Sequence, residues 1–227
     1  MLVSGGTGAL GRAVVRELLE SGTPVVSTWV SERGRDSLLD EFGEPDGVQL
    51  VQADLSRDQG AAAAVEAVSA GSLAGLVNLA GGFASGGRLH EGPPEEFERQ
   101  LELNLMTAMR LTRAALPKLI EGAGSVVCVG TKAALAPFPG ASGYIVSKAA
   151  LLALVRNLAI EYRDDGVRVN AILPSVIDTP ANRTAMPDAD HSSWVPPSEI
   201  ATVIRFLLSP DSAPISGALM PVYGRAG

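Results

Sequence analysis

A tyrosine and a lysine four positions apart, Tyr144 and Lys148, are the residues whose types and spacing most directly suggest chemistry. If this segment is a helix, both side chains lie on one face of it. A phenol ordinarily loses its proton only at about pH 10, and a neighbouring ammonium group favours the ionised form. We therefore expect Lys148 to lower the pKa of Tyr144 toward the range that suits acid–base catalysis. The same pair also occurs on solvated helix faces, so its meaning depends on the rest of the chain.

A glycine-rich segment, Ser4-Gly5-Gly6-Thr7-Gly8-Ala9-Leu10-Gly11, lies between the first expected strand and the first expected helix. Glycines at such a junction permit a tight turn, let backbone N–H groups approach a pyrophosphate, and allow a helix to pack closely on a sheet. The N-terminus of the following helix adds a partial positive charge. Elsewhere such a cluster is often only a turn, but at the first strand–helix junction it favours dinucleotide binding.

The elements that must position these residues alternate between strands and helices along the whole chain. A first strand at Val3 runs into the glycine segment, and its start looks clipped, so we expect a few further residues before Met1. Further strands are expected at 24–30, 48–52, 76–79, 125–129, 167–173 and 218–222, and helices at 12–21, 36–42, 59–69, 95–121, 141–162 and 199–208. This alternation predicts an α/β fold: a single doubly wound domain over residues 1–227, with a mostly parallel sheet of about seven strands flanked by helices.

Composition excludes several classes of protein. Hydrophobic residues make up 46% and charged residues 19% of the 227 residues, as in globular domains. The net charge of −7 argues against nucleic acid and anionic membranes as partners. Apolar runs stay shorter than about 18 residues, which predicts no transmembrane helix, and the start shows no signal peptide, so we expect a cytoplasmic protein. The one cysteine, Cys128, is expected to be buried, and His90 and His191 lack partners at metal-ligand spacing.

With two further segments, these motifs resemble the short-chain dehydrogenase/reductase family over essentially the whole chain. Asn78-Leu79-Ala80-Gly81 is similar to the family's Asn-Asn-Ala-Gly segment after the fourth strand, and 174–180 is similar to its Pro-Gly…Thr segment beside the nicotinamide. Asn104 stands where the family has its catalytic asparagine, and Asp54 matches the acidic position near the adenine. The resemblance implies a Rossmann-like fold and an NAD(P)-dependent oxidoreductase that interconverts a carbonyl and a secondary alcohol.

The resemblance also implies a catalytic set of Asn104, Thr131, Tyr144 and Lys148. Tyr144 would protonate the developing alkoxide, Thr131 would hydrogen-bond the same oxygen, Lys148 would hold the ribose hydroxyls, and Asn104 would fix a water that relays protons. The family usually has serine thirteen residues before the tyrosine, where this chain has Thr131. Threonine keeps the hydroxyl but adds a methyl group and a stiffer rotamer, which puts the pocket shape and the rate in doubt.

The choice between NADP and NAD depends on the segment after the second expected strand. Trp29 stands where a family carboxylate would select NAD, and Ser31 and Arg33 follow where they can receive a 2′-phosphate. We therefore expect NADP, although a solvated Arg33 and a Trp29 that covers the adenine or the core edge stay open as alternatives. By resemblance, the residues expected to bind the cofactor are Gly5, Thr7, Gly8, Leu10, Gly11, Ser31, Arg33, Asp54, Leu55, Asn78, Ala80, Gly81, Tyr144, Lys148, Pro174, Val176, Ile177 and Thr179.

The expected substrate pocket is mostly apolar, which indicates a small or medium-sized carbonyl compound or alcohol. By position, it is lined by Gly82, Phe83, Leu135, Phe138, Val176, Met186 and Trp194. The polar, proline-bounded segment 180–197 is expected to form a mobile lid. Within it, Arg183 either meets an anionic substrate group or stays solvated, and the acidic net charge disfavours a carrier-protein-bound substrate.

Three departures from the family pattern, Ala9, Leu79 and Ser175, indicate a divergent subfamily. Leu79 and Thr131 motivate an alternative function, a dinucleotide-binding regulator or scaffold without turnover. A nucleotide-sugar epimerase is set aside, because only a short stretch follows Thr179. The resemblance suggests a homotetramer or homodimer built on the long helices.

Overall fold

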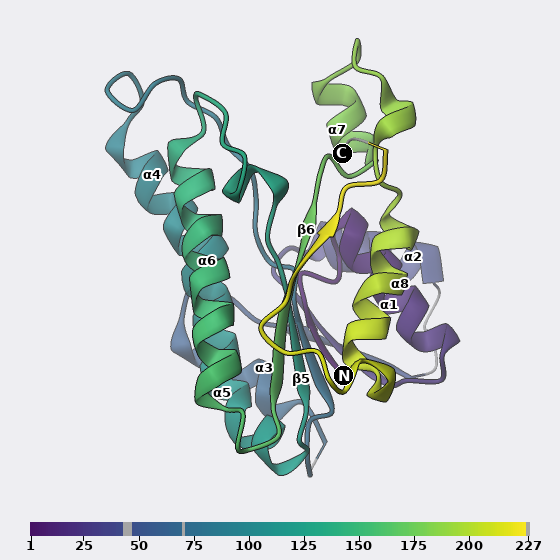
Figure 1. The fold of residues 1–227 in the computed structure, drawn as a ribbon. Coiled ribbons are helices and arrows are strands. Elements are labelled where there is room, and N and C mark those ends of the chain that lie inside the picture. The colour runs from purple at the N-terminus through teal and green to yellow at the C-terminus, as the bar shows by residue number, and fades with distance from the viewer. Residues whose placement is uncertain (43–46, 70, 226–227) are drawn as a thin grey trace.

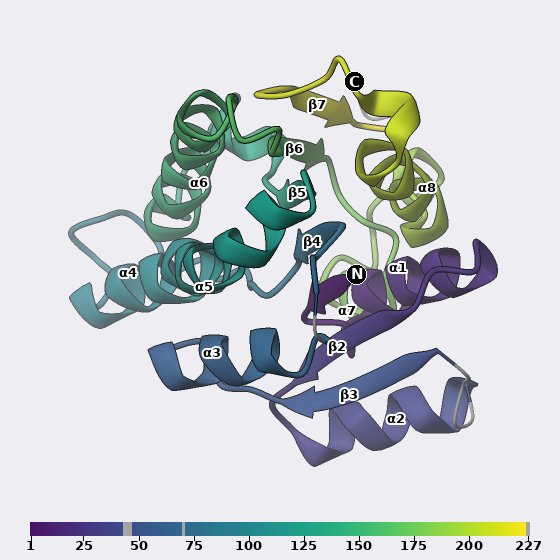
Figure 2. The ribbon, with the colours of Figure 1, turned by 90° about the horizontal axis from the view of Figure 1, so that it is seen from below.

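The computed structural model describes residues 1–42, 47–69 and 71–225. Within them, a seven-stranded parallel sheet has the strand order β3-β2-β1-β4-β5-β6-β7, seen end-on in Figure 2. The strands are β1 (Leu2–Ser4), β2 (Val25–Trp29), β3 (Val48–Gln52), β4 (Gly75–Asn78), β5 (Ser125–Val129), β6 (Arg168–Pro174) and β7 (Leu219–Val222). The α-helices are α1 (Ala9–Glu20), α2 (Glu32–Phe42), α3 (Asp58–Glu66), α4 (Pro94–Leu101), α5 (Thr107–Glu121), α6 (Ser142–Glu161), α7 (Pro180–Ala185) and α8 (Pro197–Leu208).

Helices cover both faces of the sheet, so the molecule has three layers (Figure 1). Helices α3, α5 and α6 pack on one face around buried residues such as Leu76, Leu111 and Val155. Helices α1 and α8 pack on the other face around residues such as Val15 and Ile204. The central strands are apolar and buried on both faces, as a parallel sheet between two helical layers requires. The predicted α/β class and doubly wound sheet are confirmed.

The strand order reverses beside β1, where the chain has first built β2 and β3 on one side and then β4 to β7 on the other. At such a point the loops that follow neighbouring strands diverge and leave a crevice at the carboxyl end of the sheet. The glycine segment follows β1, Asn78 ends β4, Thr131 follows β5, and Pro174 ends β6. The motifs of the sequence therefore meet at one edge of the sheet.

Two helices differ from the sequence expectation. The helix expected at 36–42 begins at Glu32, because Ser31 Oγ accepts a hydrogen bond from the Gly34 N–H and so caps its first turn. Arg33 therefore lies in a helical turn and not in a loop. The long helix expected at 95–121 is interrupted by a π-helical segment, η1 (Glu102–Met106), that contains Asn104. Such insertions in α-helices are frequent at functional sites.

Helix α6 is the one described helix whose length and mean hydropathy of 1.4 would suffice to cross a membrane. In this fold it lies along one face of the sheet (Figure 1), with Leu151, Leu152 and Val155 in the core. It also carries Tyr144 and Lys148 in its first turns. Its apolar composition therefore serves the packing of the domain.

Candidate active site

The glycine segment is built so tightly that side chains do not fit at several positions. Gly5 has a φ of +68°, and a Cβ on it would lie 2.9 Å from the Ala80 backbone nitrogen. A Cβ on Gly11 would lie 2.2 Å from the Gly5 carbonyl oxygen, and one on Gly6 would lie 1.9 Å from Ser27 Oγ. Gly8 precedes α1 as its N-cap residue. Helix α1 thus begins directly against the loop, which leaves backbone N–H groups at a helix N-terminus for a phosphate group.

A cavity of about 400 Å³ adjoins this loop. Six of the predicted cofactor residues line it, namely Gly5, Thr7, Ser31, Asp54, Leu55 and Ala80. Thr28 and Trp29 at the end of β2 line it as well, as does the η1 segment through Glu102 and Leu103. A larger cavity of about 750 Å³ lies beside Met1 and Ser125, at the amino end of the strands, and its described lining contains no predicted site residue. The tight glycine cradle and the smaller cavity thus adjoin each other on the side of the crevice that β1 and β2 form.

Trp29 is 9% exposed and forms part of the cavity wall. The guanidinium of Arg35 lies 5.0 Å from the centre of its ring, and the same guanidinium forms an ion pair with Asp36 at 2.7 Å. Arg33 is exposed and is not among the lining residues. The sequence singled out Arg33, whereas the structure brings Arg35 closer to the cavity wall.

The other predicted cofactor residues occupy varied environments. Asp54 is exposed, and hydrogen bonds from Ser56 hold the pKa of its carboxyl below the ordinary value. Asn78 is buried, and its amide nitrogen donates to Thr112 Oγ1 at 2.9 Å, so this side chain faces the core. Leu10 packs on the apolar cluster beneath α1. Pro174 pairs with Val222 at the end of the sheet.

Leu79 lacks the side-chain amide that the family has at this position, but another residue makes a bond to the strand end. Ser4 Oγ accepts hydrogen bonds from the backbone N–H groups of Leu79, at 3.0 Å, and Ala80, at 3.1 Å. The ends of β1 and β4 are therefore held together by a hydroxyl, while the Leu79 side chain packs on the core.

Three members of the predicted catalytic set converge at the end of β5. The Thr131 side chain lies close enough to Tyr144 to act on the pKa of the phenol, and Thr131 Oγ1 accepts from the Ala133 N–H at 3.3 Å. The Lys148 ammonium is buried and donates to the Val129 carbonyl oxygen at 2.7 Å. The hydroxyl, the phenol and the ammonium thus occupy one small region of the crevice.

The expectation from the sequence that Lys148 lowers the pKa of Tyr144 is wrong. Burial raises the pKa of the phenol above its ordinary value, and the hydrogen bond with Thr131 only partly opposes this. Burial also lowers the pKa of Lys148, to about 8. The spacing of the pair suggested the effect of a nearby charge, whereas removal of the phenol from water dominates in the fold.

Asn104 binds the backbone that follows β4. Its Oδ1 accepts from the Gly82 N–H and its Nδ2 donates to the Gly82 carbonyl oxygen, both at 3.0 Å. A Cβ on Gly81 would lie 2.7 Å from Asn104 Oδ1 and 3.4 Å from Lys148 Nζ. The amide, the ammonium and this glycine are therefore close neighbours. The same Nδ2 also donates to Gln100 Oε1, a residue that the sequence analysis did not select.

Exposed apolar side chains lie beside the phenol. Phe83 packs edge-on against the Tyr144 ring, with 5.0 Å between ring centres, and Phe138 lies 6.4 Å from Phe83. Phe83, Leu135, Phe138 and Met186 are all exposed. Trp194, also expected here, is 8% exposed and packs against His191, with 4.3 Å between ring centres and a tilt of 46° between the rings. Its ring is therefore largely occupied by packing within its own segment.

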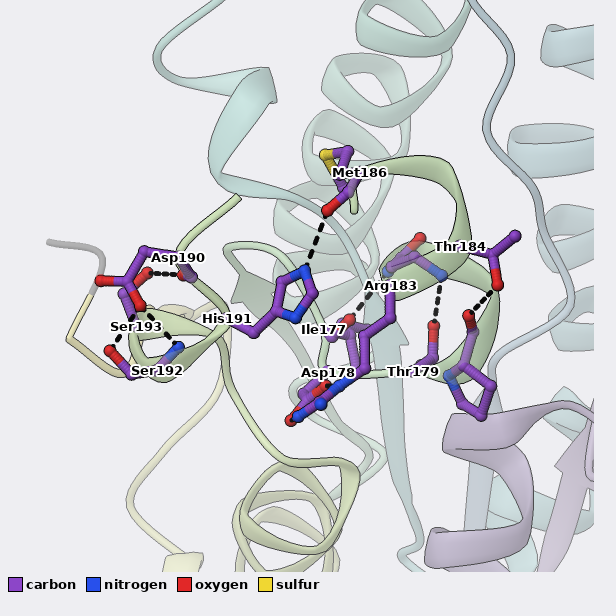
Figure 3. A network of polar contacts seen from close by, with 12 residues as sticks. Ile177, Asp178, Thr179, Arg183, Thr184, Met186, Asp190, His191, Ser192 and Ser193 are labelled. Atoms are coloured by element: carbon purple, nitrogen blue, oxygen red, sulfur yellow. Dashed lines mark hydrogen bonds and ion pairs between the residues drawn. The ribbon is translucent and has the colours of Figure 1, made fainter. Parts of the chain in front are cut away.

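The segment expected to form a lid makes polar contacts within itself, which appear in Figure 3. Thr179 caps α7 by accepting from the Asn182 N–H, and Arg183 pairs with Asp178. His191 contacts the Met186 carbonyl oxygen through Nε2 at 2.9 Å. Arg183 is exposed to solvent, and its guanidinium is bound to a carboxylate of the same segment.

The two ends of this segment are tied to each other. Ile177 and Val195 form a parallel β-bridge, and the Val195 N–H donates to the Val176 carbonyl oxygen at 3.0 Å. Val176 and Ile177, both predicted to bind the cofactor, thereby lie at the base of the segment. No group of three or more potential metal ligands is found among the described side chains.

Comparison with known proteins agrees with this architecture. A family model described as enoyl-(acyl carrier protein) reductase matches residues 6–224. The 2-(R)-hydroxypropyl-CoM dehydrogenase of Xanthobacter autotrophicus is 30% identical and covers 98% of this chain and 96% of its own. The dehydrogenase/reductase SDR family member 4 of Bos taurus is also 30% identical, over 98% of this chain and 85% of its own.

Solved structures agree as well. A short-chain dehydrogenase/reductase from Mycobacterium ulcerans has a TM-score of 0.92 at 27% identity and covers 99% of this chain and 88% of its own. An NADPH-bound short-chain oxidoreductase from Pseudomonas aeruginosa, described as having an atypical catalytic centre, has a TM-score of 0.88 at 27% identity, over 100% of this chain and 95% of its own. This chain therefore belongs to the short-chain dehydrogenase/reductase family and is an oxidoreductase that uses a nicotinamide dinucleotide.

Proposed function

We propose that this oxidoreductase interconverts a carbonyl compound and a secondary alcohol, with Tyr144 as the general acid and base. The observation that supports this most directly is the convergence of the Thr131 hydroxyl, the Tyr144 phenol and the Lys148 ammonium at the end of β5. Two hydroxyl groups held together in this way can both contact one substrate oxygen. The nicotinamide supplies the hydride when it is bound.

Each residue of the set has a defined task in this proposal. The raised pKa keeps Tyr144 protonated at neutral pH, so it is ready to give its proton to the oxygen of a carbonyl under reduction. Thr131 donates a second hydrogen bond to that oxygen and stabilises the developing charge. The Lys148 ammonium has three N–H donors, of which one is used by Val129, so the others are available for ribose hydroxyls. Asn104 holds the backbone at Gly82.

We infer a preference for NADP. Trp29 closes β2 where a carboxylate would select the unphosphorylated ribose. Ser31 lines the cavity, Arg33 lies in the next helical turn, and Arg35 stacks on the cavity wall. The Ser31 hydroxyl on the cavity wall and the Arg35 guanidinium over Trp29 are suited to a phosphate group.

The proposed substrate is a small or medium-sized apolar carbonyl compound. Phe83 and Phe138 offer exposed apolar surface beside the phenol, Leu135 and Met186 are exposed as well, and apolar walls with few polar groups are usual for such substrates. The name of the Xanthobacter relative refers to a 2-hydroxypropyl group, which is a secondary alcohol, and this agrees with the proposed reaction. A cytoplasmic location and a homotetramer or homodimer stay predictions.

The test compares wild type with Tyr144→Phe in NADPH oxidation with cyclohexanone, acetophenone and benzaldehyde. Removal of the phenol oxygen should lower kcat by about 100-fold or more, since the proton donor is lost, while the Kd for NADPH stays nearly constant. Tyr162→Phe is a matched control at the other end of α6. Turnover near the wild-type rate in Tyr144→Phe would refute the assigned role. Tight NADPH binding without turnover of these substrates by wild type would favour the alternative, a dinucleotide-binding regulator, which Thr131 in place of serine motivates.

A further inference from the structure

A buried glutamine stands behind the active-site asparagine. Gln100 lies in α4 and is 1% exposed. Its Oε1 accepts from Asn104 Nδ2 at 3.0 Å, and its Nε2 donates to Glu96 Oε1 at 2.8 Å. The three residues are spaced by four, so they share one face of the helix that continues into η1. Both ends of the buried side chain are therefore used in hydrogen bonds.

These hydrogen bonds all run in one direction. The Glu96 carboxylate only accepts, and Arg99 binds it through two donors, each at 2.9 Å. Gln100 must therefore turn its amino group toward Glu96 and its oxygen toward Asn104. Asn104 must in turn face Gln100 with its nitrogen, which leaves its oxygen for the Gly82 N–H. A carboxylate at the start of α4 thus fixes the orientation of an amide in the active site.

The glutamine also contacts the helix that carries the phenol. A Cβ on Gly143, the residue before Tyr144, would lie 3.3 Å from Gln100 Cβ. On the other side, Gly82 precedes Phe83, whose ring packs against Tyr144. Gln100 therefore lies between the backbone of α6 and the asparagine that holds Gly82, and both of these flank the phenol.

We propose that Gln100 is a positioning residue for the reaction. It holds the Asn104 amide in the orientation that clamps Gly82, and thereby holds Phe83 and Gly81 in place beside Tyr144 and Lys148. This inference rests on the proposed function for its effect on turnover, but the clamp itself exists without substrate. A small displacement of groups around a reacting centre is enough to reduce rates strongly.

Three variants test the polarity of the hydrogen bonds. Gln100→Met keeps the size of the side chain but removes both bonds. Gln100→Glu keeps an acceptor for Asn104 but places a second carboxylate next to Glu96. The hydrogen bond at that contact can then form only at a pH at which the two carboxylates share a proton. The double variant Glu96→Gln with Gln100→Glu restores one donor and one acceptor at that contact. Glu98→Gln changes an exposed charge on the same helix and is the matched control.

Two readouts are measured: kcat with the best ketone of the panel, and hydrogen exchange of the Gly82 N–H by NMR in the substrate-free protein. Gln100→Met should lower kcat about 10-fold or more with little change in the Kd for NADPH, and should speed Gly82 exchange. Gln100→Glu should lose more activity at pH 8 than at pH 6, and the double variant should recover activity and lose this pH dependence.

Wild-type kcat in Gln100→Met would overturn the inference, and so would lost turnover with unchanged Gly82 exchange. The inference would be overturned equally if the double variant had no higher kcat than Gln100→Glu, or if kcat of Gln100→Glu had the same pH dependence as kcat of wild type. Turnover by Tyr144→Phe would instead refute the proposed function, and the Gly82 exchange would still decide whether the clamp exists.

Discussion

Replacement of Lys148 by methionine should change how the stability of the fold depends on pH. Lys148 is 7% exposed, and burial lowers its pKa from the ordinary 10.5 to about 8. Between these two values the unfolded chain binds a proton at this lysine that the folded chain has released. The free energy of unfolding of wild type should therefore rise with pH in that window, because the unfolded state binds more protons.

The size of the effect follows from the same two values. One pH unit corresponds to about 1.4 kcal/mol, so the difference between 10.5 and about 8 is worth about 3 kcal/mol in full. Because the titration is gradual, between about 2 and 3 kcal/mol of this falls between pH 7 and pH 10. Burial raises the pKa of Tyr144 and so opposes the trend only above its ordinary value near 10.

Urea denaturation of the cofactor-free protein, followed by circular dichroism from pH 7 to pH 10, measures the difference. At pH 7 the free energy of unfolding of Lys148→Met should be higher than that of wild type, because methionine does not bury a charge. This difference in the free energy of unfolding should shrink by between about 2 and 3 kcal/mol at pH 10. Groups common to both proteins cancel in the comparison. Curves that stay parallel over the whole range would show that the ammonium is not held in a desolvated position and would refute this reasoning.

Two further predictions concern the cofactor site. Gly6→Ala should destabilise the fold by about 1–3 kcal/mol in urea denaturation, because the added methyl group overpacks against Ser27 Oγ. Adding Ser27→Ala removes that hydroxyl, which is buried without a described partner, and should recover much of the lost stability. A double variant as unstable as Gly6→Ala would exclude this contact as the cause. Arg35→Ala should lower the affinity for NADPH about tenfold in fluorescence titrations and leave the affinity for NADH nearly unchanged. Arg33→Ala tests in the same way the residue chosen from the sequence. An equal loss of affinity for both cofactors would contradict the NADP preference.

Much of the fold could be predicted because its signals are local. Apolar runs bounded by glycine and proline mark buried strands, and the order of the motifs places them after successive strands. Since parallel strands end at one edge of the sheet, the residues that follow them could be expected there; the pairing of Thr131 with Tyr144 comes from the resemblance to the family, and in the structure Thr131 lies next to the phenol.

The remaining features depend on tertiary contacts. The π-helical turn around Asn104 has no compositional signal, and the direction of the Tyr144 pKa is set by burial that spacing does not reveal. Arg35 was overlooked because α2 begins earlier than expected, which turns a presumed loop into a helix. Gln100 did have a signal, since Glu96, Gln100 and Asn104 are spaced by four, but only the packing of α4 on α6 gives that spacing a role.

The β-bridge between Ile177 and Val195 also has an evolutionary consequence. Because the bridge joins the two ends of the surface segment between these residues, the segment can change in sequence without moving the elements to which those ends connect. Residues 178–194 form this segment, closed on itself at the mouth of the crevice. Substitutions, insertions or deletions inside this segment can therefore accumulate with little effect on the seven strands of the sheet, all of which lie outside it.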